Sequence, residues 1–270
     1  MKNILVPTDF SACAGHALNA SFKLADKFGS TLHLLHSLAT PPKGASKDEL
    51  QQATENAQLL LKSIAAKHPS IDCVLQVSVG KLKDTISSYL EKHQVDLVVM
   101  GSHGAGGKQE FFIGSNTQKV IRTIHAPVLV IKDELKDIDF NTVVFASSFN
   151  LNEREAFLRF KDFVKHFIPE IHLVSVHTSS LFDPPYVLSQ EVMNDFKELC
   201  QPFACHTHIY RDFTIEKGIR GFAEEIDAKL IAVSNVNQHP FKRMLIGSNV
   251  EALVNHSKLP VLSIDYTPKK

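Results

Sequence analysis

The sequence has no excess of either charge and no long apolar segment. Its 270 residues carry 29 basic and 29 acidic side chains, which argues against a nucleic-acid-binding or membrane-surface protein. Apolar runs stay well below the roughly 18–20 residues of a transmembrane helix. Near the amino end, Pro7 and Asp9 interrupt the chain before the apolar core of a signal peptide could form. We therefore expect a cytoplasmic protein with no membrane and no nucleic-acid partner.

Cysteine is scarce, at four residues: Cys13, Cys73, Cys200 and Cys205. So few cysteines in a chain of this size do not indicate a disulfide framework. The segment from Cys200 to His208 has zinc-ligand residue types, but its spacing is not that of a standard knuckle. On a strand, His206 and His208 would share one face and Cys205 would point away. We expect no metal site here, with a buried cysteine beside partly exposed histidines, and a structural zinc is the alternative.

Strand-like apolar runs alternate with helical stretches along the first half of the chain. The expected strands begin at residues 4, 31, 72, 97 and 128, and the expected helices cover 12–28, 47–67, 84–93 and 116–124. Either Asp9 or Ser11 could cap the first of these helices. This alternation predicts a parallel sheet with helices on both faces.

The pattern then recurs in the second half. Four pairs of segments correspond, at an offset of 139 residues for the first two and 133 for the last two: Ile4–Phe10 with Val143–Phe149, Leu32–Leu35 with Ile171–Val174, Leu97–Met100 with Leu230–Val233, and Ala126–Ile131 with Leu259–Ile264. Such a repeat predicts two homologous domains, 1–132 and 139–268, joined by the charged linker Lys132–Asp139.

Five of the 12 glycines fall in one stretch, GSHGAGGKQEFFIGSN, from residue 101 to residue 116. Gly101 follows a strand, where it could take a positive φ and let a ligand approach the backbone. Gly114, Ser115 and Asn116 open a helix whose unbonded N–H groups favour an anion such as phosphate. Ser115 and Gln118 also have the spacing of a capping box. A solvated loop with an ordinary cap is the alternative.

The spacing Gly101-x2-Gly104-x9-Gly114-Ser115 is similar to the glycine signature of the universal stress protein family. Three further stretches look like that family: Val6–Ser11, Leu34–His36 and Ala126–Val130. Because the similarity covers both halves, the chain resembles a tandem universal stress protein. The resemblance implies an α/β fold of two homologous domains, each a five-stranded parallel doubly wound sheet of the adenine-nucleotide alpha-hydrolase type. It also implies ATP as the ligand of domains that keep the signature.

The resemblance further implies which residues surround the nucleotide. Those near the ribose and phosphates would be Gly101, His103, Gly104, Gly114, Ser115 and Asn116. Those on the adenine side would be Pro7, Thr8, Asp9 and the backbone at Ser37. Asp9 could accept a hydrogen bond from the ribose or the adenine amino group, or hold Mg²⁺ beside the phosphates. Its alternative role as a helix cap is compatible with both.

The second half departs from this pattern. The matching positions are Ser234 for Gly101, Asn237 for Gly104, Ser148 for Asp9 and Glu251 for Gln118, with Gly247 and Ser248 retained. Added side chains and a carboxylate at the helix start would oppose a phosphate, although Lys242 and Arg243 could supply positive charge. We therefore expect ATP to bind in the first half only. The apolar loop Ser179–Tyr186 would cover the vacant pocket of its own half or dock a partner.

The sequence is compatible with three functions. The first is an ATP-binding regulatory or stress-response protein, whose halves pair within one chain through Val128–Ile131 and Val261–Ile264 and which could form a further homodimer. The second is a slow ATPase or an ATP-dependent transferase, although the Gly-x-Ser-x-Gly and His-Glu-x-x-His motifs are missing and no catalytic residue is predicted. The third is a nucleotide-free adaptor.

Overall fold

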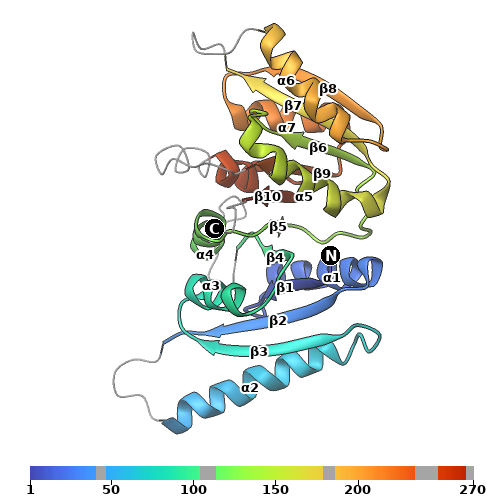
Figure 1. Cartoon of the computed structure of the whole chain (residues 1–270). Helices are drawn as coiled ribbons and strands as arrows, with labels where there is room; N and C mark the ends of the chain where they lie inside the picture. Colours follow the sequence, from blue (N-terminus) through green and yellow to red (C-terminus); the bar gives the residue numbers. More distant parts are fainter. Residues whose placement is uncertain (41–46, 104–113, 179–185, 235–248, 266–270) are drawn as a thin grey trace. The chain divides into compact units, whose positions relative to one another are not determined.

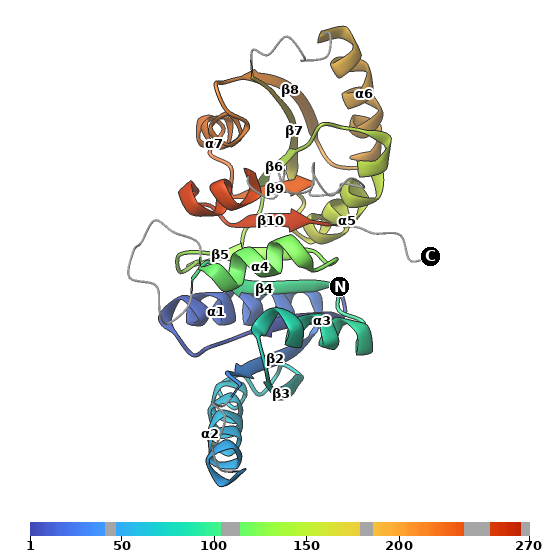
Figure 2. The same cartoon turned by 90° about the vertical axis from the view of Figure 1, so that its left-hand side faces the viewer.

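The computed structural model describes residues 1–40, 47–103, 114–178, 186–234 and 249–265. The chain divides into two compact units. Unit 1 is made of Met1–Ala126 with Ile131–Ile138, and unit 2 is made of Pro127–Val130 with Asp139–Lys270. Figures 1 and 2 show that each unit is a sheet covered by helices.

The first repeat alternates strands and helices as its sequence pattern predicts. Its elements are β1 (Asn3–Pro7), α1 (Ala12–Phe28), β2 (Thr31–Leu38), α2 (Lys47–Ala65), β3 (Cys73–Val79), α3 (Leu82–Lys92), β4 (Leu97–Gly101), α4 (Ser115–Thr123) and β5 (Val128–Ile131). The strand order in unit 1 is β3-β2-β1-β4, and the pairs are parallel. The order reverses between β1 and β4, and the carboxyl ends of two such strands are where doubly wound sheets generally bind ligands.

Burial explains why these segments form central strands. Ile4, Leu5 and Val6 of β1 are fully buried, as are Leu97–Val99 of β4. Strands covered by helices on both faces need such continuous apolar runs, whereas half-exposed strands alternate. The edge strand β3 has mostly half-buried residues, which suits its position.

Unit 2 repeats the alternation of strands and helices and also includes β5 of the first repeat. Its elements are β6 (Thr142–Ala146), η1 (Leu151–Glu153), α5 (Arg154–Val164), η2 (Lys165–Phe167), β7 (Glu170–His177), α6 (Tyr186–Leu199), β8 (Cys205–Arg211), α7 (Ile215–Glu225), β9 (Leu230–Ser234) and β10 (Val261–Ile264), with residues 249–256 helical. The parallel order is β10-β9-β6-β7-β8, and β5 pairs antiparallel with β10, so that Leu129 lies opposite Leu262. Residues 127–130 thus belong to the first repeat by sequence and to unit 2 by their contacts.

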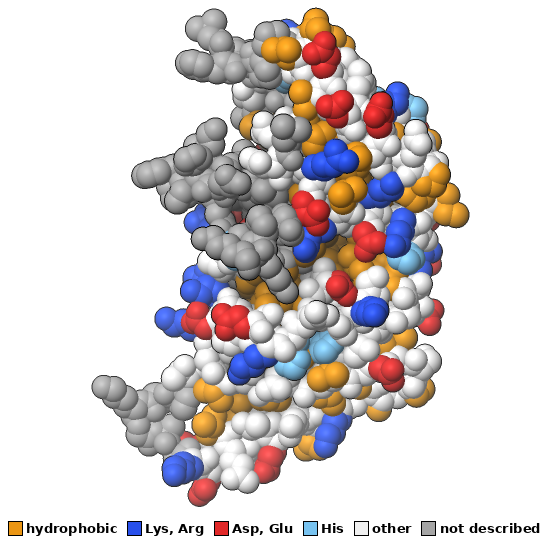
Figure 3. All heavy atoms as spheres, in the orientation of Figure 1, with side chains coloured by type: hydrophobic (Ala, Val, Ile, Leu, Met, Phe, Trp, Pro, Cys, Tyr) orange, Lys and Arg blue, Asp and Glu red, His pale blue; other side chains and the backbone are white. Residues whose placement is uncertain are grey.

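Charged side chains of both signs are interspersed over the described surface drawn in Figure 3. This mixture agrees with the balance of 29 basic and 29 acidic residues in the sequence. Among the described residues, no helix is both long and apolar enough to cross a membrane.

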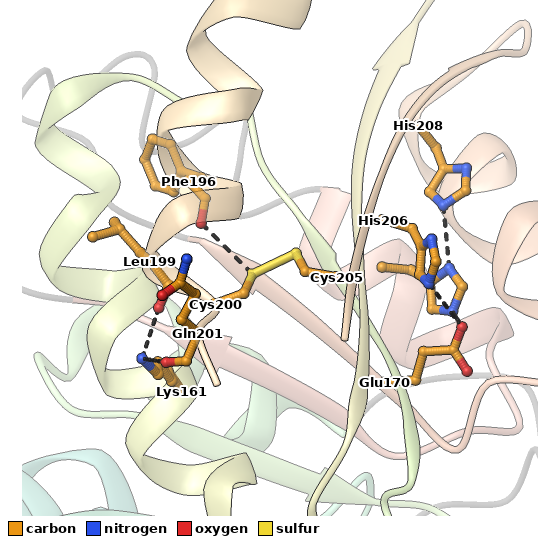
Figure 4. The surroundings of a disulfide bond; sticks show 10 residues. Lys161, Glu170, Phe196, Leu199, Cys200, Gln201, Cys205, His206 and His208 are labelled. Carbon is orange, nitrogen blue, oxygen red and sulfur yellow. Dashed lines mark hydrogen bonds and ion pairs between the residues drawn. A yellow bond between two sulfur atoms is a disulfide. The ribbon is translucent and has the colours of Figure 1, made fainter. Parts of the chain in front are cut away.

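The number of cysteines predicted no disulfide framework, and it gave no sign of the single disulfide that the structure contains. Cys200 and Cys205 form a disulfide across the turn between α6 and β8 (Figure 4). The turn brings their Cα atoms to 6.2 Å, which is within the range that a disulfide can span. Next to it, the Lys161 ammonium donates a hydrogen bond to the carbonyl of Leu199 at 2.7 Å. A count of cysteines cannot reveal such a pairing, because it depends on how the turn folds.

Candidate functional site

The chain leaves β1 through a tight turn that holds Pro7, Thr8 and Asp9. The Thr8 N–H donates to the Leu35 carbonyl of β2 at 2.9 Å, and the Thr8 hydroxyl accepts from the Phe10 N–H at 3.1 Å. Phe10 has a φ of 63°, in the left-handed region that bulky residues rarely adopt. Backbone strain of this kind is typical of ligand-binding turns. The turn therefore occupies the carboxyl edge of β1 in a defined and unusual conformation.

Ser11, and not Asp9, caps the first helix. The Ser11 hydroxyl accepts from the Ala14 N–H at 3.2 Å, in the usual geometry of an N-cap. Asp9 instead accepts a hydrogen bond from the Ser11 N–H at 3.1 Å. Its side chain is exposed at the carboxyl edge of the sheet. Asp9 is therefore not the cap of α1, and its exposed carboxylate lies where a ligand could contact it.

Two residues at the end of β2 take different roles. His36 contacts the β1 turn, because its Nδ1 lies 2.8 Å from the Thr8 carbonyl oxygen and its ring packs on Phe10 with centroids 4.6 Å apart. Ser37 donates its hydroxyl to the Gly80 carbonyl at 2.8 Å, on the side of β3. His36 therefore supports the strained turn directly, a role that the sequence did not suggest.

Gly101 is a glycine for a different reason from the one expected. Its φ is not positive, whereas Gly29 and Gly80 do have positive φ. A Cβ at Gly101 would lie 2.9 Å from both the carbonyl oxygen and the Sγ of Cys13, closer than real Cβ contacts come. The close approach of α1 to the end of β4 therefore requires glycine here, independently of any ligand.

Hydrogen bonds close the two ends of the glycine-rich segment onto each other. The Gly114 N–H donates to the Ser102 carbonyl at 2.8 Å, and the Thr117 hydroxyl donates to the Gly101 carbonyl at 2.9 Å. The Ser102 hydroxyl lies 2.8 Å from Nδ1 of His103. These contacts place His103 and the start of α4 at the carboxyl end of β4. Gly104, the remaining member of the predicted set, lies outside the described residues.

Helix α4 begins one residue earlier than its sequence suggests. Gly114 is the N-cap, with φ −63° and ψ 143°, and no side chain of the described residues caps this end. Ser115 is already helical, so the expected capping box with Gln118 does not form. Ser115 and Asn116 are exposed in this first turn. The first N–H groups of the helix thus point to an end that a ligand anion could satisfy.

Unit 1 also has a cleft of about 480 Å³ between β3 and α3. Gly80, Lys81 and Lys92 are among its lining residues, and none of the ten predicted nucleotide contacts is. Its connection to the predicted site is through Ser37, which donates its hydroxyl to the Gly80 carbonyl.

The equivalent turn in unit 2 has the same backbone conformation as the turn of the first repeat, but different side chains accept its hydrogen bonds. Phe149 has a φ of 56°, and its N–H donates to the Ser147 hydroxyl at 2.9 Å. The acceptor at the helix start is now Glu153, whose Oε2 receives the Ser148 hydroxyl at 3.0 Å and the Asn150 N–H at 2.9 Å. A buried carboxylate has therefore replaced the exposed one of Asp9.

Other parts of the altered second motif are only partly described. Ser234, which replaces Gly101, ends β9 and is 7% exposed. Glu251 is buried in the helical residues 249–256. The remaining predicted members lie outside the described residues: Asn237, Lys242, Arg243, Gly247, Ser248 and loop residues 179–185.

A family comparison agrees with this geometry. The model of the universal stress protein family matches residues 1–132 and, a second time, residues 139–264. The chain belongs to the universal stress protein family. The two matches also show that it is a tandem universal stress protein, as the repeated sequence pattern indicated.

Individual universal stress proteins are similar to one repeat or to the whole chain. Universal stress protein MJ0577 of Methanocaldococcus jannaschii is 30% identical over 153 residues, which are 48% of this chain and 94% of that protein. Universal stress protein MJ0531 of the same organism is 26% identical over 144 residues, which are 50% of this chain and 85% of that protein. The crystal structure of a universal stress protein from Archaeoglobus fulgidus covers 98% of both chains at 22% identity, with a TM-score of 0.79. The predicted fold, two α/β domains of the adenine-nucleotide alpha-hydrolase type, is confirmed.

A histidine cluster lies on the other face of β8 from the disulfide of this universal stress protein (Figure 4). His172 Nδ1 lies 3.1 Å from His208 Nε2, and His206 Nε2 lies 3.0 Å from a Glu170 oxygen. Burial lowers the pKa of His172 and of His208 below the usual value, and neighbouring histidines lower it further. No group of three or more potential metal ligands is arranged to hold an ion in the described parts of the chain.

Several residues that shape the site carried no sequence signal of their own. Cys13, Ser102 and Thr117 hold the ends of the glycine-rich segment, and Glu153 holds the turn of the second repeat. Each acts through a neighbour in space. From the sequence alone, only their closeness to a motif along the chain could have indicated that they belong to the site.

Proposed function

We propose that this chain is an ATP-binding regulatory protein of the stress response, with the nucleotide held by its first repeat alone. The observation that carries the proposal is the start of α4. Its cap residue Gly114 offers no side chain, and its first turn is exposed at the carboxyl edge of a doubly wound sheet. This combination suits a phosphate group, since helix N–H groups and the helix dipole both favour negative charge there.

The phosphate end would consist of Gly101, His103, Gly104, Gly114, Ser115 and Asn116. The hydrogen bonds from Gly114 to Ser102 and from Thr117 to Gly101 support this assignment, because they hold both ends of the segment close together. His103 has its Nδ1 turned to Ser102, so Nε2 is the ring atom available to a ligand.

The adenosine end would consist of Pro7, Thr8, Asp9 and Ser37. The strained turn supports this assignment, since Asp9 is exposed while Thr8 is anchored to β2. The Asp9 carboxylate could accept a ribose hydroxyl, and it is the type of oxygen ligand that Mg²⁺ uses beside phosphates.

The second repeat would not bind ATP. The buried carboxylate of Glu153 accepts hydrogen bonds from the turn that corresponds to the Asp9 turn, and like charges repel strongly where water is excluded. Ser234 adds a side chain where Gly101 has none. We further propose that the two repeats pair through their final strands within one chain, which the β5–β10 pair supports, and that the chain can form a homodimer.

The decisive experiment is calorimetric titration of Mg·ATP into the intact chain and into Gly114→Asp. We expect one ATP per chain in the unaltered protein. An aspartate at this N-cap satisfies the helix and repels phosphate, so affinity should fall by at least about tenfold while thermal stability is kept or raised.

Gly114→Asn is the matched control, because it supplies a neutral cap of nearly the same shape. It should bind ATP more tightly than Gly114→Asp does. Two ATP molecules per chain would contradict the difference between the repeats. Absence of binding, in protein free of co-purified nucleotide, would contradict the proposal as a whole, and phosphate release in the same samples would reveal slow hydrolysis.

A further inference from the structure

Unit 2 has a cavity of about 410 Å³ at the carboxyl ends of its central strands. The last residues of β6, β7 and β9 line it, namely Ala146, His177 and Ser234. Residues of α6 and α7 line it as well, and Figure 2 shows these helices on opposite sides of the sheet. Strand order reverses between β6 and β9, so the cavity occupies the crevice where doubly wound sheets bind ligands.

The walls of this cavity are mainly apolar. Val176 stands where the first repeat has Ser37, and Val250 stands where it has Thr117. Met193 of α6 and Ile219 of α7 contribute to the apolar lining as well. Valines at positions where the first repeat has a serine and a threonine make this cavity more apolar, and an apolar cavity favours a ligand with little charge.

One polar group in this lining is unsatisfied. Ser234 is 7% exposed, and its hydroxyl has no hydrogen-bond partner in the part of the chain that the structure describes. Leaving a buried hydroxyl unpaired is costly, and native proteins rarely do so without a reason. A hydroxyl or amine on a bound molecule would give Ser234 the partner that it lacks.

A charged side chain in the lining selects against anions. Glu153 lines the cavity and is 5% exposed, and both of its described hydrogen bonds end on Oε2. Its second oxygen is an acceptor, so it favours a ligand that donates a hydrogen bond and repels one that carries a carboxylate or phosphate.

We propose that this cavity binds a small, uncharged and mainly apolar molecule that carries one hydroxyl or amine donor. The donor would lie at the end formed by Ser234 and Glu153, and the apolar body would lie between α6 and α7. Leu188 and Ile215 also line the cavity and are 53% and 41% exposed, which is consistent with an opening to solvent between these helices. The second repeat would then be a sensor of a different ligand and not only a partner for the first.

The test uses three naphthalene derivatives of similar size with the intact chain. 2-Naphthol is neutral and donates a hydrogen bond, 2-methoxynaphthalene has no donor, and 2-naphthoate is an anion. Because the chain has no tryptophan, naphthol fluorescence can be excited without interference from the protein. We expect saturable binding of one 2-naphthol per chain, with the other two compounds weaker by about fivefold to tenfold or more.

Two substitutions and one matched control locate the site. Val192→Phe fills the cavity from α6, and the matched control Val187→Phe adds the same ring at a position of that helix that is 64% exposed and does not line the cavity. Only the first should abolish binding. Ser234→Ala should weaken 2-naphthol, because the ligand hydroxyl loses one of its two partners and keeps only the acceptor of Glu153. It should not lower the melting temperature without ligand, because the hydroxyl that it removes has no partner.

The proposal would be overturned by a folded chain that binds no 2-naphthol, or by binding that survives Val192→Phe. Equal affinity for 2-naphthol and 2-methoxynaphthalene would also overturn it. Mg·ATP should not displace 2-naphthol, since the nucleotide belongs to the other repeat. Displacement would mean that the second repeat binds nucleotide, whereas failure of ATP to bind at all would leave the naphthol result unaffected.

Discussion

Two glycines of the first repeat have opposite surroundings. A Cβ at Gly101 would press against Cys13, whereas a Cβ at Gly15, inside α1, would meet nothing within 4 Å. We expect Gly101→Ala to destabilise the fold by about 1–3 kcal/mol, since the backbone of Cys13 must move. Gly15→Ala should stabilise it by about 0.5–1 kcal/mol, because it lowers the entropy lost in forming the helix.

Urea unfolding of both variants measures this difference. If Gly101→Ala is as stable as the unaltered chain, then packing against Cys13 does not explain the glycine at this position. Contact with a ligand would then be its explanation. The family signature would in that case report binding alone. A loss of stability would mean that one glycine of the signature serves the fold first.

The buried His172 and the half-buried His208 make the stability of unit 2 depend on pH. The pKa values of His172 and His208 are lowered from 6.5, chiefly by burial, and Glu170 opposes the shift at His172. The unfolded chain therefore takes up protons first as the pH falls below 6.5, and the folded state loses stability in that range. The stability is fully present above this pH.

We expect the melting temperature to fall between about pH 7.5 and about pH 5.5, and His208→Gln to reduce that fall. Differential scanning calorimetry at both pH values checks the effect. The same fall in the variant and in the unaltered chain would show that this cluster does not cause it.

At the scale of elements, two helices begin in different ways. Ser11 caps α1 through its side chain, whereas Gly114 precedes α4 and the serine after it is already helical. Ser11→Ala should therefore cost about 1 kcal/mol, and Ser115→Ala should change the free energy of unfolding by less than about 0.5 kcal/mol. Chemical denaturation of the two variants tests this directly. A comparable loss in both would mean that Ser115 acts as a cap after all.

The whole molecule is not the sum of two independent halves. Residues 127–130 come from the first repeat but pair with β10 in unit 2, where Leu129 is fully buried opposite Leu262. A polar group there would disturb a strand that the second repeat needs, because an unpaired edge strand loses its hydrogen bonds.

Leu129→Asp should thus remove hydrogen-exchange protection from the amides of Val261–Ile264. Val74→Asp, on the half-exposed edge strand β3, is the control and should leave those amides protected. Retained protection in Leu129→Asp would contradict a structural role of β5 in unit 2.

The two repeats also diverge in chemistry while sharing a backbone. The strained phenylalanine recurs at Phe10 and Phe149 with nearly the same φ. Around it, an exposed carboxylate in one repeat is matched by a buried one in the other. One chain could in this way hold two different ligands at equivalent places.

The amino-acid sequence by itself determined the class of fold, the duplication and the family. Continuous apolar runs such as Leu97–Met100 and the spacing of glycines are local patterns, and a sequence displays local patterns directly. Segment limits followed from them to within a few residues.

Only the tertiary structure determined the contacts between residues that lie far apart in the sequence. Gly101 meets Cys13, His36 meets Thr8, and Ser234 lines a cavity of unit 2 without a partner among the described residues. The cap of α4 and the Cys200–Cys205 disulfide likewise depend on how a turn folds. These features follow from packing between elements, which no single stretch of sequence contains.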